Sequence, residues 1–254
     1  MLRAMVMLSL ALFSMSITAQ NASSDSIAVG LAQKSMESLA GRLSVADVTL
    51  QAEVTSMIGA DPESGSGTFR AKGLGQSRVD LSFGGDTRSD IRNRIGGTMQ
   101  KNGGAAKAQA GHNCMTDAAW FFPALSSLAQ SGNPSFVFKY IGEEEHTSVN
   151  TQHIQVSQIF PQDKSGVLER LSATDFYLDA ASNLPVAITF QTHPDNDLNV
   201  NIITEIRFSD YRSVNGILEP FSFQQMLNGR VILEAKVTSA EVNASLPENI
   251  FALQ

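Results

Sequence analysis

The pattern of apolar and polar positions from residue 174 to residue 251 predicts a succession of β-strands with no helix between them. Apolar and polar residues alternate in short runs separated by turn signals such as Asn228-Gly229, and Asn215-Gly216 predicts a further tight reversal between Tyr211 and Leu218. This alternation is typical of strands with one buried face. Because short turns cannot form the crossover that parallel strands need, the strands are expected to pair antiparallel. The runs cover 174–179, 184–190, 200–208, 209–220, 221–227, 230–242 and 246–251.

The first half of the chain predicts one helix followed by further strands. Residues 27–43 form an amphipathic pattern that ends near Gly41, with one apolar stripe made of Ala28, Ala32, Met36, Leu39 and Leu43. Residues 61–67 are predicted to form a turn. Residues 96–111, rich in Gly, Ala, Lys and Gln, are predicted to form a mobile loop. The expected strands are 48–54, 68–72, 78–83, 88–94, 136–141 and 153–160.

An apolar segment, residues 116–129, interrupts the strands near the middle of the chain. We expect it to be helical, with Pro123 interrupting or restarting the helix. Its large apolar side chains lie beside the predicted loop and would suit the lid or wall of an apolar cavity. Ordinary core packing is the alternative, because clustered aromatic residues are usually core residues. The candidate ligand-binding residues are Trp120, Phe121, Phe122, Leu125 and Leu128.

The N-terminal sequence predicts where the protein is located. A short basic start precedes an apolar stretch, 4–18, that is too short to span a bilayer, and Ala19 provides a small residue before a cleavage point. We therefore expect residues 1–19 to be a secretory signal peptide cut after Ala19; an uncleaved anchor is the alternative. The single cysteine, Cys114, lies far from this point, which excludes a lipid-modified cysteine there. Residues 20–254 are expected to form one periplasmic or secreted domain without a transmembrane segment.

Charge narrows the choice of partners. The formal net charge is −7, with 18 basic and 25 acidic residues, which argues against nucleic-acid binding because that needs a cationic surface. Residues 70–107, however, contain eight basic and three acidic residues, a local net charge of +5. This region is a candidate surface for an anionic or acidic partner. Solvated sheet faces are the alternative reading.

The sequence carries no convincing catalytic or metal-binding motif. The four histidines are too widely spaced for a zinc pattern. Cys114 lies near His112 and Asp117, but a catalytic thiolate needs a base at hydrogen-bonding distance and an orienting group. A partly buried thiol is the simpler interpretation. We therefore assign no catalytic residue, no metal ligand and no cofactor.

The order of the elements resembles the periplasmic outer-membrane lipoprotein-carrier superfamily with the LolA/LolB-like fold. The stretches 176–185 and 208–220, followed by Asn228-Gly229, are similar to the C-terminal half of uncharacterised secreted bacterial proteins with that fold. The resemblance implies a mainly β (α+β) protein. Its strongly curved antiparallel sheet, a half-open barrel, would wrap around the N-terminal helix and the central apolar segment, leaving a cavity for acyl chains. The carriers' cavity arginine matches no motif here, so Arg70, Arg78 and Arg92 receive no such role.

Two functional hypotheses follow. The first is a non-catalytic extracytoplasmic carrier that holds a lipid, an acylated protein or another apolar ligand in the cavity of the curved sheet. The second is a protein–protein interaction or envelope-sensor module with a filled core and a basic partner surface at residues 70–107. A hydrolase that uses Cys114 is a more distant third.

Overall fold

A computed structural model describes residues 23–93 and 96–253. The predicted signal peptide, residues 1–19, lies outside the described residues. In the described part, thirteen strands form one antiparallel sheet in the order β6-β5-β4-β3-β2-β1-β13-β12-β11-β10-β9-β8-β7. The strands are β1 Asp47–Ser56, β2 Glu63–Lys72, β3 Gln76–Phe83, β4 Asp86–Asn93, β5 Gly96–Lys101, β6 Lys107–Ala108, β7 Phe136–His146, β8 Val149–Gln158, β9 Thr174–Asp179, β10 Pro185–Thr192, β11 Ile202–Val214, β12 Ile217–Leu227 and β13 Arg230–Val242.

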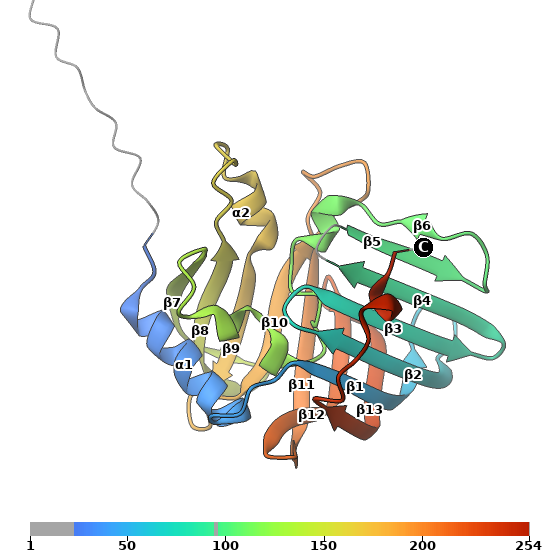
Figure 1. The fold of residues 1–254 in the computed structure, drawn as a ribbon, viewed down its shortest axis with the longest axis horizontal. Helices are drawn as coiled ribbons and strands as arrows, with labels where there is room; N and C mark the ends of the chain where they lie inside the picture. Colours follow the sequence, from blue (N-terminus) through green and yellow to red (C-terminus); the bar gives the residue numbers. More distant parts are fainter. Residues whose placement is uncertain (1–22, 94–95, 254) are drawn as a thin grey trace, which may run out of the picture.

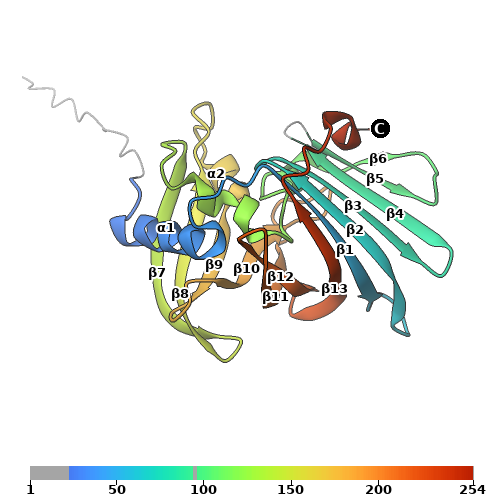
Figure 2. The same ribbon diagram turned by 60° about the horizontal axis from the view of Figure 1, so that its bottom comes forward.

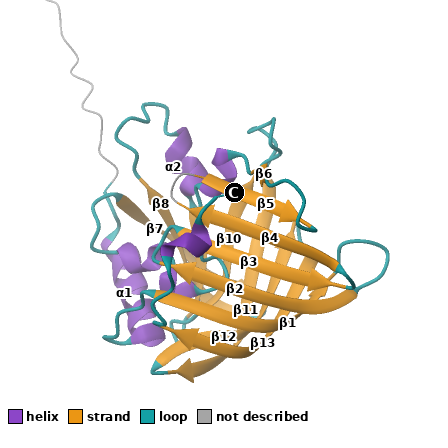
Figure 3. Ribbon diagram, turned by 45° about the vertical axis from the view of Figure 1, so that its right-hand side comes forward, coloured by secondary structure: helices purple, strands orange, loops and turns teal. Residues whose placement is uncertain are grey.

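The sheet is strongly curved and remains open. Strands that follow one another in the chain pair directly, and pairing of β1 with β13 joins the two halves. The single exception is β6 and β7, which are the two edges of the sheet. Figures 1 and 2 show the two halves rising on either side of an opening, and Figure 3 shows their strands crossing steeply. The predicted half-open barrel is confirmed.

Helix α1, Ser26–Ala40, lies against the β7 end of the sheet (Figure 2). It packs on β7, β8 and β12, and ends at Gly41, whose φ of 59° suits glycine. The residues before it run along the edge of β7: the Asp25 N–H donates to Phe138 O, and the Asp25 carboxylate accepts from Tyr140 N. These contacts partly cover an edge strand that would otherwise expose unpaired backbone groups.

Two tight hairpins in the C-terminal half agree with the sequence prediction. Asn215-Gly216 joins β11 to β12, and Asn228-Gly229 joins β12 to β13. All four residues have positive φ values, between 47° and 86°, as a two-residue type I′ turn requires.

Several sequence predictions were wrong. Residues 96–111 are not a plain loop, because β5 and β6 lie there and extend the sheet beyond β4. The predicted turn at 61–67 is largely the start of β2. Gly65 and Gly67 belong in this strand because the side chains of Phe83 and Leu81 occupy the space that a Cβ would need. Residues 246–251 end in a short 3₁₀ helix, η4 Glu248–Phe251, instead of a strand. The short helix α2, Val167–Ser172, has no counterpart in the prediction.

The central apolar segment is also less helical than predicted. It contains two short 3₁₀ helices, η2 Pro123–Leu125 and η3 Ser127–Gln130, and no α-helix. Another 3₁₀ helix, η1 Gly111–Cys114, precedes it. Pro123 has no N–H to donate to a preceding carbonyl, and Ser126 has extended backbone angles that break the helix again. We call residues 116–130 the plug segment. It belongs to the connection between β6 and β7, the two edges of the sheet.

Candidate functional site

The plug segment places its large apolar residues inside the curved sheet. Phe121, Phe122 and Leu128 are fully buried and Leu125 is 6% exposed, while Trp120 is partly buried against the same core. The structure therefore brings all five sequence-predicted residues into one hydrophobic cluster. Their role as a lid or cavity wall stays a prediction.

An aromatic group joins the plug segment to both halves of the sheet. The ring of Phe69 on β2 lies 5.3 Å from Phe121, 6.1 Å from Trp120 and 5.1 Å from Phe223 on β12, measured between centroids. Trp120 also lies 6.0 Å from Phe223, edge to face. Aromatic pairs in these arrangements add stability beyond their buried area. We call these four residues the aromatic group.

Polar contacts give the plug segment its compact shape. The Asp117 carboxylate accepts hydrogen bonds from the backbone N–H and the hydroxyl of Ser127, each 2.9 Å long. The Ser126 hydroxyl donates to Pro123 O and accepts from Leu128 N. These bonds close residues 117–128 into a loop held by its own side chains.

Arg92 fastens this loop to the sheet. Pairing across β2, β3 and β4 aligns Phe69, Val79 and Asp90 on the inner face, and Arg92 shares that face two residues further along β4. Its guanidinium donates from Nη2 to Thr116 O at 2.9 Å and from Nη1 to Asp117 O at 3.5 Å. The Arg92 Nε is buried without a partner. A buried charge with incomplete hydrogen bonding costs free energy, so the contact between Arg92 and the plug segment is weaker than a fully bonded one.

Burial dominates the electrostatics here. It raises the pKa of the Asp117 carboxyl to about 6, although the hydrogen bonds from Ser127 and the charge of Arg92 oppose the shift. Burial also lowers the pKa of Arg92 and raises that of the Cys114 thiol. A thiol with a raised pKa is a poor nucleophile, so this environment does not favour the Cys114 hydrolase hypothesis.

An open cleft of about 570 Å³ lies over the plug segment. We call it the mouth cleft. Cys114, Asp117 and Ser127 line one side, and apolar residues from the other edge of the sheet, including Phe136 and Val156, line the other. The mouth cleft therefore connects solvent to the point where the plug segment meets both halves of the barrel. A larger cleft of about 630 Å³, with polar residues such as Lys139 and Asp175, lies away from the plug segment.

Three solved structures match this architecture along nearly all of their own length. A structure described as an outer membrane lipoprotein-sorting protein domain, from Vibrio parahaemolyticus, is 14% identical, with a TM-score of 0.55 over 89% of this chain and 96% of its own. A DUF1329 family protein from Desulfovibrio piger is 11% identical, with a TM-score of 0.53 over 89% and 96%. A LolA superfamily protein from Nitrosomonas europaea is 9% identical, with a TM-score of 0.53 over 89% and 97%.

The protein has the LolA-like fold. No protein-family model and no curated protein matches the sequence, so the fold is the extent of the established relationship. The resemblance inferred from the order of elements is thereby confirmed at the level of architecture. No helix among the described residues is both long enough and apolar enough to cross a membrane.

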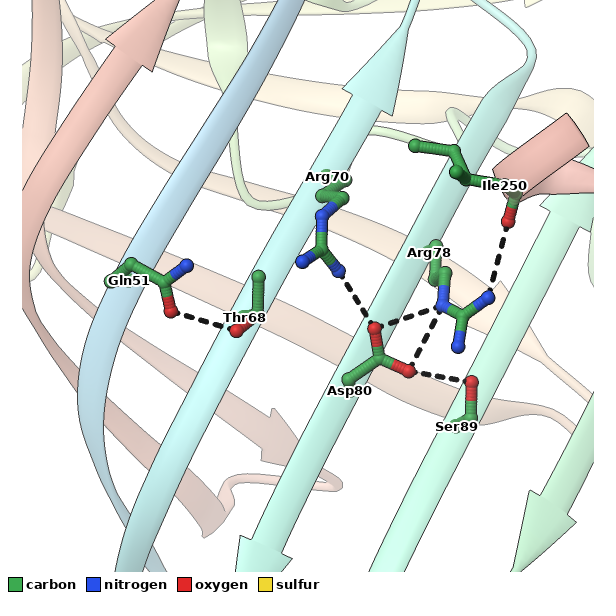
Figure 4. A network of polar contacts seen from close by, with 7 residues as sticks. All are labelled: Gln51, Thr68, Arg70, Arg78, Asp80, Ser89 and Ile250. Carbon is green, nitrogen blue, oxygen red and sulfur yellow. Dashed lines mark hydrogen bonds and ion pairs between the residues drawn. The ribbon is translucent and has the colours of Figure 1, made fainter. Parts of the chain in front are cut away.

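Five of the eight basic residues at 70–107 have acidic partners in the described part of this LolA-like barrel. Figure 4 shows Arg70 and Arg78 sharing the Asp80 carboxylate, at 2.8 and 2.9 Å, while Ser89 donates to the same carboxylate. Burial alone would raise the pKa of Asp80, but the bonds from Arg78 and Ser89 and both arginine charges hold it below its ordinary value. Further cations in this region have acidic partners: Lys72–Glu248, Arg88–Asp90 and Lys101–Asp86. These pairs use four carboxylates for five cations, so the region keeps an excess of positive charge. The partner-surface hypothesis stays a prediction.

Two of the four widely spaced histidines, His146 and His153, form an ionic cluster with carboxylates from several strands. His153 lies between Glu144, at 2.5 Å, and Asp175, at 2.9 Å, and His146 lies 3.0 Å from Glu205. Both imidazoles contact the Tyr177 ring, and His153 is only 11% exposed. Among the described residues, no three His, Cys, Asp or Glu side chains converge as a metal site would require. The cluster fixes the β7–β8 hairpin against β9 and β11.

Proposed function

We propose that the protein is a non-catalytic extracytoplasmic carrier that holds an acyl chain, or another apolar molecule, between its curved sheet and the plug segment. The observation that carries the proposal is the position of the plug segment. This apolar segment connects β6 to β7, the two edge strands of the sheet, and folds into the barrel. Some of its residues line the mouth cleft. The LolA-like fold, found also in a protein described as lipoprotein-sorting, supports this proposal.

Binding would exchange the contacts of the plug segment for contacts of an acyl chain. In the closed state the side chains of Trp120 and Phe121 pack against the aromatic residues of the sheet. An acyl chain that replaced them would keep the inner face of the sheet dry, and each buried methylene would contribute about 0.8 kcal/mol. A chain of about twelve methylenes would therefore gain about 10 kcal/mol, which offsets the cost of displacing part of the plug segment. No catalytic residue is needed.

Localisation forms part of this proposal. Cleavage after Ala19 would release residues 20–254 as a single domain outside the cytoplasm, where acyl chains pass between membranes or proteins. Edman sequencing of the protein recovered from the envelope tests it. An N-terminus at Gln20 supports the proposal, and retention of residues 1–19 contradicts it.

The single tryptophan of the chain, Trp120, provides the direct test of ligand binding. Bromine atoms quench tryptophan fluorescence on contact, so the mature protein is titrated with dibromostearate and, separately, with stearate. We expect saturable quenching by the brominated chain alone. Quenching that does not saturate, or that is equal for both ligands, would contradict the proposal.

A variant with the tryptophan outside the barrel is the matched control. Trp120→Phe keeps an aromatic ring in the plug segment, and Ile58→Trp adds a tryptophan at a position that is 64% exposed. Dibromostearate should not quench this double variant at the same concentrations. Equal quenching would show that the ligand binds the surface of the protein instead of its interior.

A further inference from the structure

Glu219, on β12, is a buried carboxyl group without a partner. It has no solvent exposure, and none of the residues that the structure describes donates a hydrogen bond to either of its carboxyl oxygen atoms. Buried carboxyl groups are normally hydrogen-bonded or paired with a cation, because removing the charge from water is expensive. Burial raises the pKa of Glu219 to about 7, so a substantial fraction is ionised at neutral pH.

Glu219 faces the interior of the barrel. Ile217 and Phe223, at alternate positions on the same face of β12, both belong to the hydrophobic core. Phe223 is also part of the aromatic group that the plug segment contacts. It lies four residues from Glu219, about 13 Å along the strand. An extended acyl chain can span that distance.

Helix α1 covers this part of β12 with mostly small side chains. Its end lies close to the β11–β12 turn, where a Cβ on Gly216 would approach Leu43 to 3.0 Å. The hydroxyl of Ser35, buried on the helix, also lacks a hydrogen-bond partner. Small residues provide little buried area, so α1 is held weakly on this side. Its buried positions are Ala28, Ala32, Ser35, Leu39 and Ala40.

No charged side chain of the neighbouring elements compensates Glu219. Arg212 is its register partner on β11, but its guanidinium is bound to Asp210 at 2.6 Å and lies over the Phe221 ring. On α1 the charged residues Lys34 and Glu37 are exposed. The buried residues of β13 are apolar: Leu233, Ala235, Val237 and Val242.

We propose that Glu219 binds the positively charged amine of a ligand whose apolar chain lies toward the aromatic group. This inference rests on the proposed carrier function and adds the class of headgroup. A desolvated ammonium group offers three donors to the two unpartnered oxygens, and an alcohol would leave the charge uncompensated. A carboxylate headgroup, such as that of a fatty acid, would be repelled from Glu219 and would bind only with its headgroup at the opposite end of the site.

Three probes with the same chain test the headgroup: dodecylammonium, dodecanol and dodecanoate, below their micellar concentrations. Isothermal titration calorimetry with the mature protein at pH 8 is expected to show dodecylammonium binding about 10- to 100-fold more tightly than dodecanol, the range for one hydrogen-bonded charge pair. At pH 5.5, where Glu219 is protonated, the preference should shrink.

Glu219→Gln keeps the shape of the side chain and removes its charge. In this variant the preference for dodecylammonium should fall to about twofold or less, with dodecanol affinity unchanged. Glu241→Gln, at an exposed position of β13, makes the same change of charge and should keep the preference. A melting curve for each variant checks that it is folded.

The results separate the two claims. Equal binding of all three probes, or a preference that survives Glu219→Gln, overturns the headgroup inference and leaves the carrier function standing. Binding of none of the probes contradicts both.

Discussion

The Arg92 guanidinium donates a hydrogen bond to the carbonyl oxygen of Thr116 across 2.9 Å, and so ties the first residue of the plug segment to β4. The contact joins an element of the sheet to the segment that fills its opening. Because the Arg92 Nε has no partner, the arginine is held by fewer bonds than it can make. In our account, breaking this contact is a step in admitting a ligand.

Arg92→Met should therefore loosen the plug segment. Loss of the donor leaves the Thr116 carbonyl unsatisfied, at a cost of about 1–3 kcal/mol. Amide hydrogen exchange in residues 116–130 should accelerate more than exchange in β11 and β12, and dibromostearate should quench Trp120 sooner after mixing. Arg230→Met, at an exposed position, is the control and should change neither rate. Uniformly faster exchange throughout the sheet would show that Arg92 supports the whole fold and not the plug segment in particular.

The Asp117 carboxyl should make stability fall as pH rises. Its folded-state pKa of about 6 lies above the ordinary aspartate value of 3.8, so the folded protein holds the proton more tightly than the unfolded chain. The contribution is complete below pH 3.8 and is lost as pH rises toward 6. The difference of about 2 between these pKa values corresponds to about 3 kcal/mol.

Urea unfolding of the wild type and of Asp117→Asn at several pH values isolates this effect. The amide keeps an oxygen that can accept from Ser127 but cannot ionise. The wild type should lose stability relative to the variant between pH 4 and 6.5. A constant difference across this range would contradict the assignment.

The stability contributed by the histidine cluster should also fall as pH rises. In this cluster nearby carboxylates raise the pKa of His153, whereas burial raises that of Asp117. Burial lowers the pKa of His153, but hydrogen bonds and charge from Asp175 and Glu144 outweigh this effect, and the pKa lies above the ordinary histidine value of 6.5. The stabilisation is fully present below pH 6.5 and disappears as pH rises through the folded-state pKa. An NMR titration of the imidazole should give a midpoint above 6.5, compared with His153→Gln for assignment. A midpoint below 6.5 would mean that the carboxylates do not dominate.

Gly229→Val should destabilise the protein without affecting ligand binding. Gly229 has a φ of 78°, and a β-branched residue there is strained by about 1 kcal/mol or more. Gly132→Val is a suitable control because Gly132 is exposed, has no positive φ, and a Cβ there meets no atom within 4 Å. Chemical denaturation should separate the two variants. Equal stability would argue against a positive-φ requirement in the β12–β13 turn.

The sequence predicts the C-terminal half of the sheet well because alternation and turn chemistry agree there. The predicted strand 174–179 matches β9 at both ends, and Asn228-Gly229 joins two expected strands. The predicted reversal at Asn215-Gly216 is also present, but it divides the expected strand 209–220 between β11 and β12. The pattern fails at β5 and β6, where the side chains give little alternation and the strands are held by backbone pairing of β5 with β4 and of β6 with β5. It also fails in the plug segment, where Pro123 and the Asp117–Ser127 bonds favour 3₁₀ turns over an α-helix.

The candidate site is only partly visible in the sequence. Clustered apolar residues identify the plug segment, but Arg92 and Glu219 acquire their roles through burial and strand register. Because side chains alternate between the two faces of a strand, Arg88, Asp90 and Arg92 share one face of β4 and Ile91 lies on the other. This alternation does not show which face is inside, because the buried Ile91 lies on the outer face, where η4 packs against β4. Glu219 likewise occupies an inward position that an apolar residue would ordinarily fill.

Native mass spectrometry of the mature protein, purified from the envelope without detergent, tests the carrier claim most directly. The account predicts a stoichiometric adduct of lipid mass, recovered by organic extraction and reduced when Trp120 and Phe122 are replaced by polar residues in a protein that still folds. A bare protein mass, together with no uptake of added dibromostearate, would contradict it.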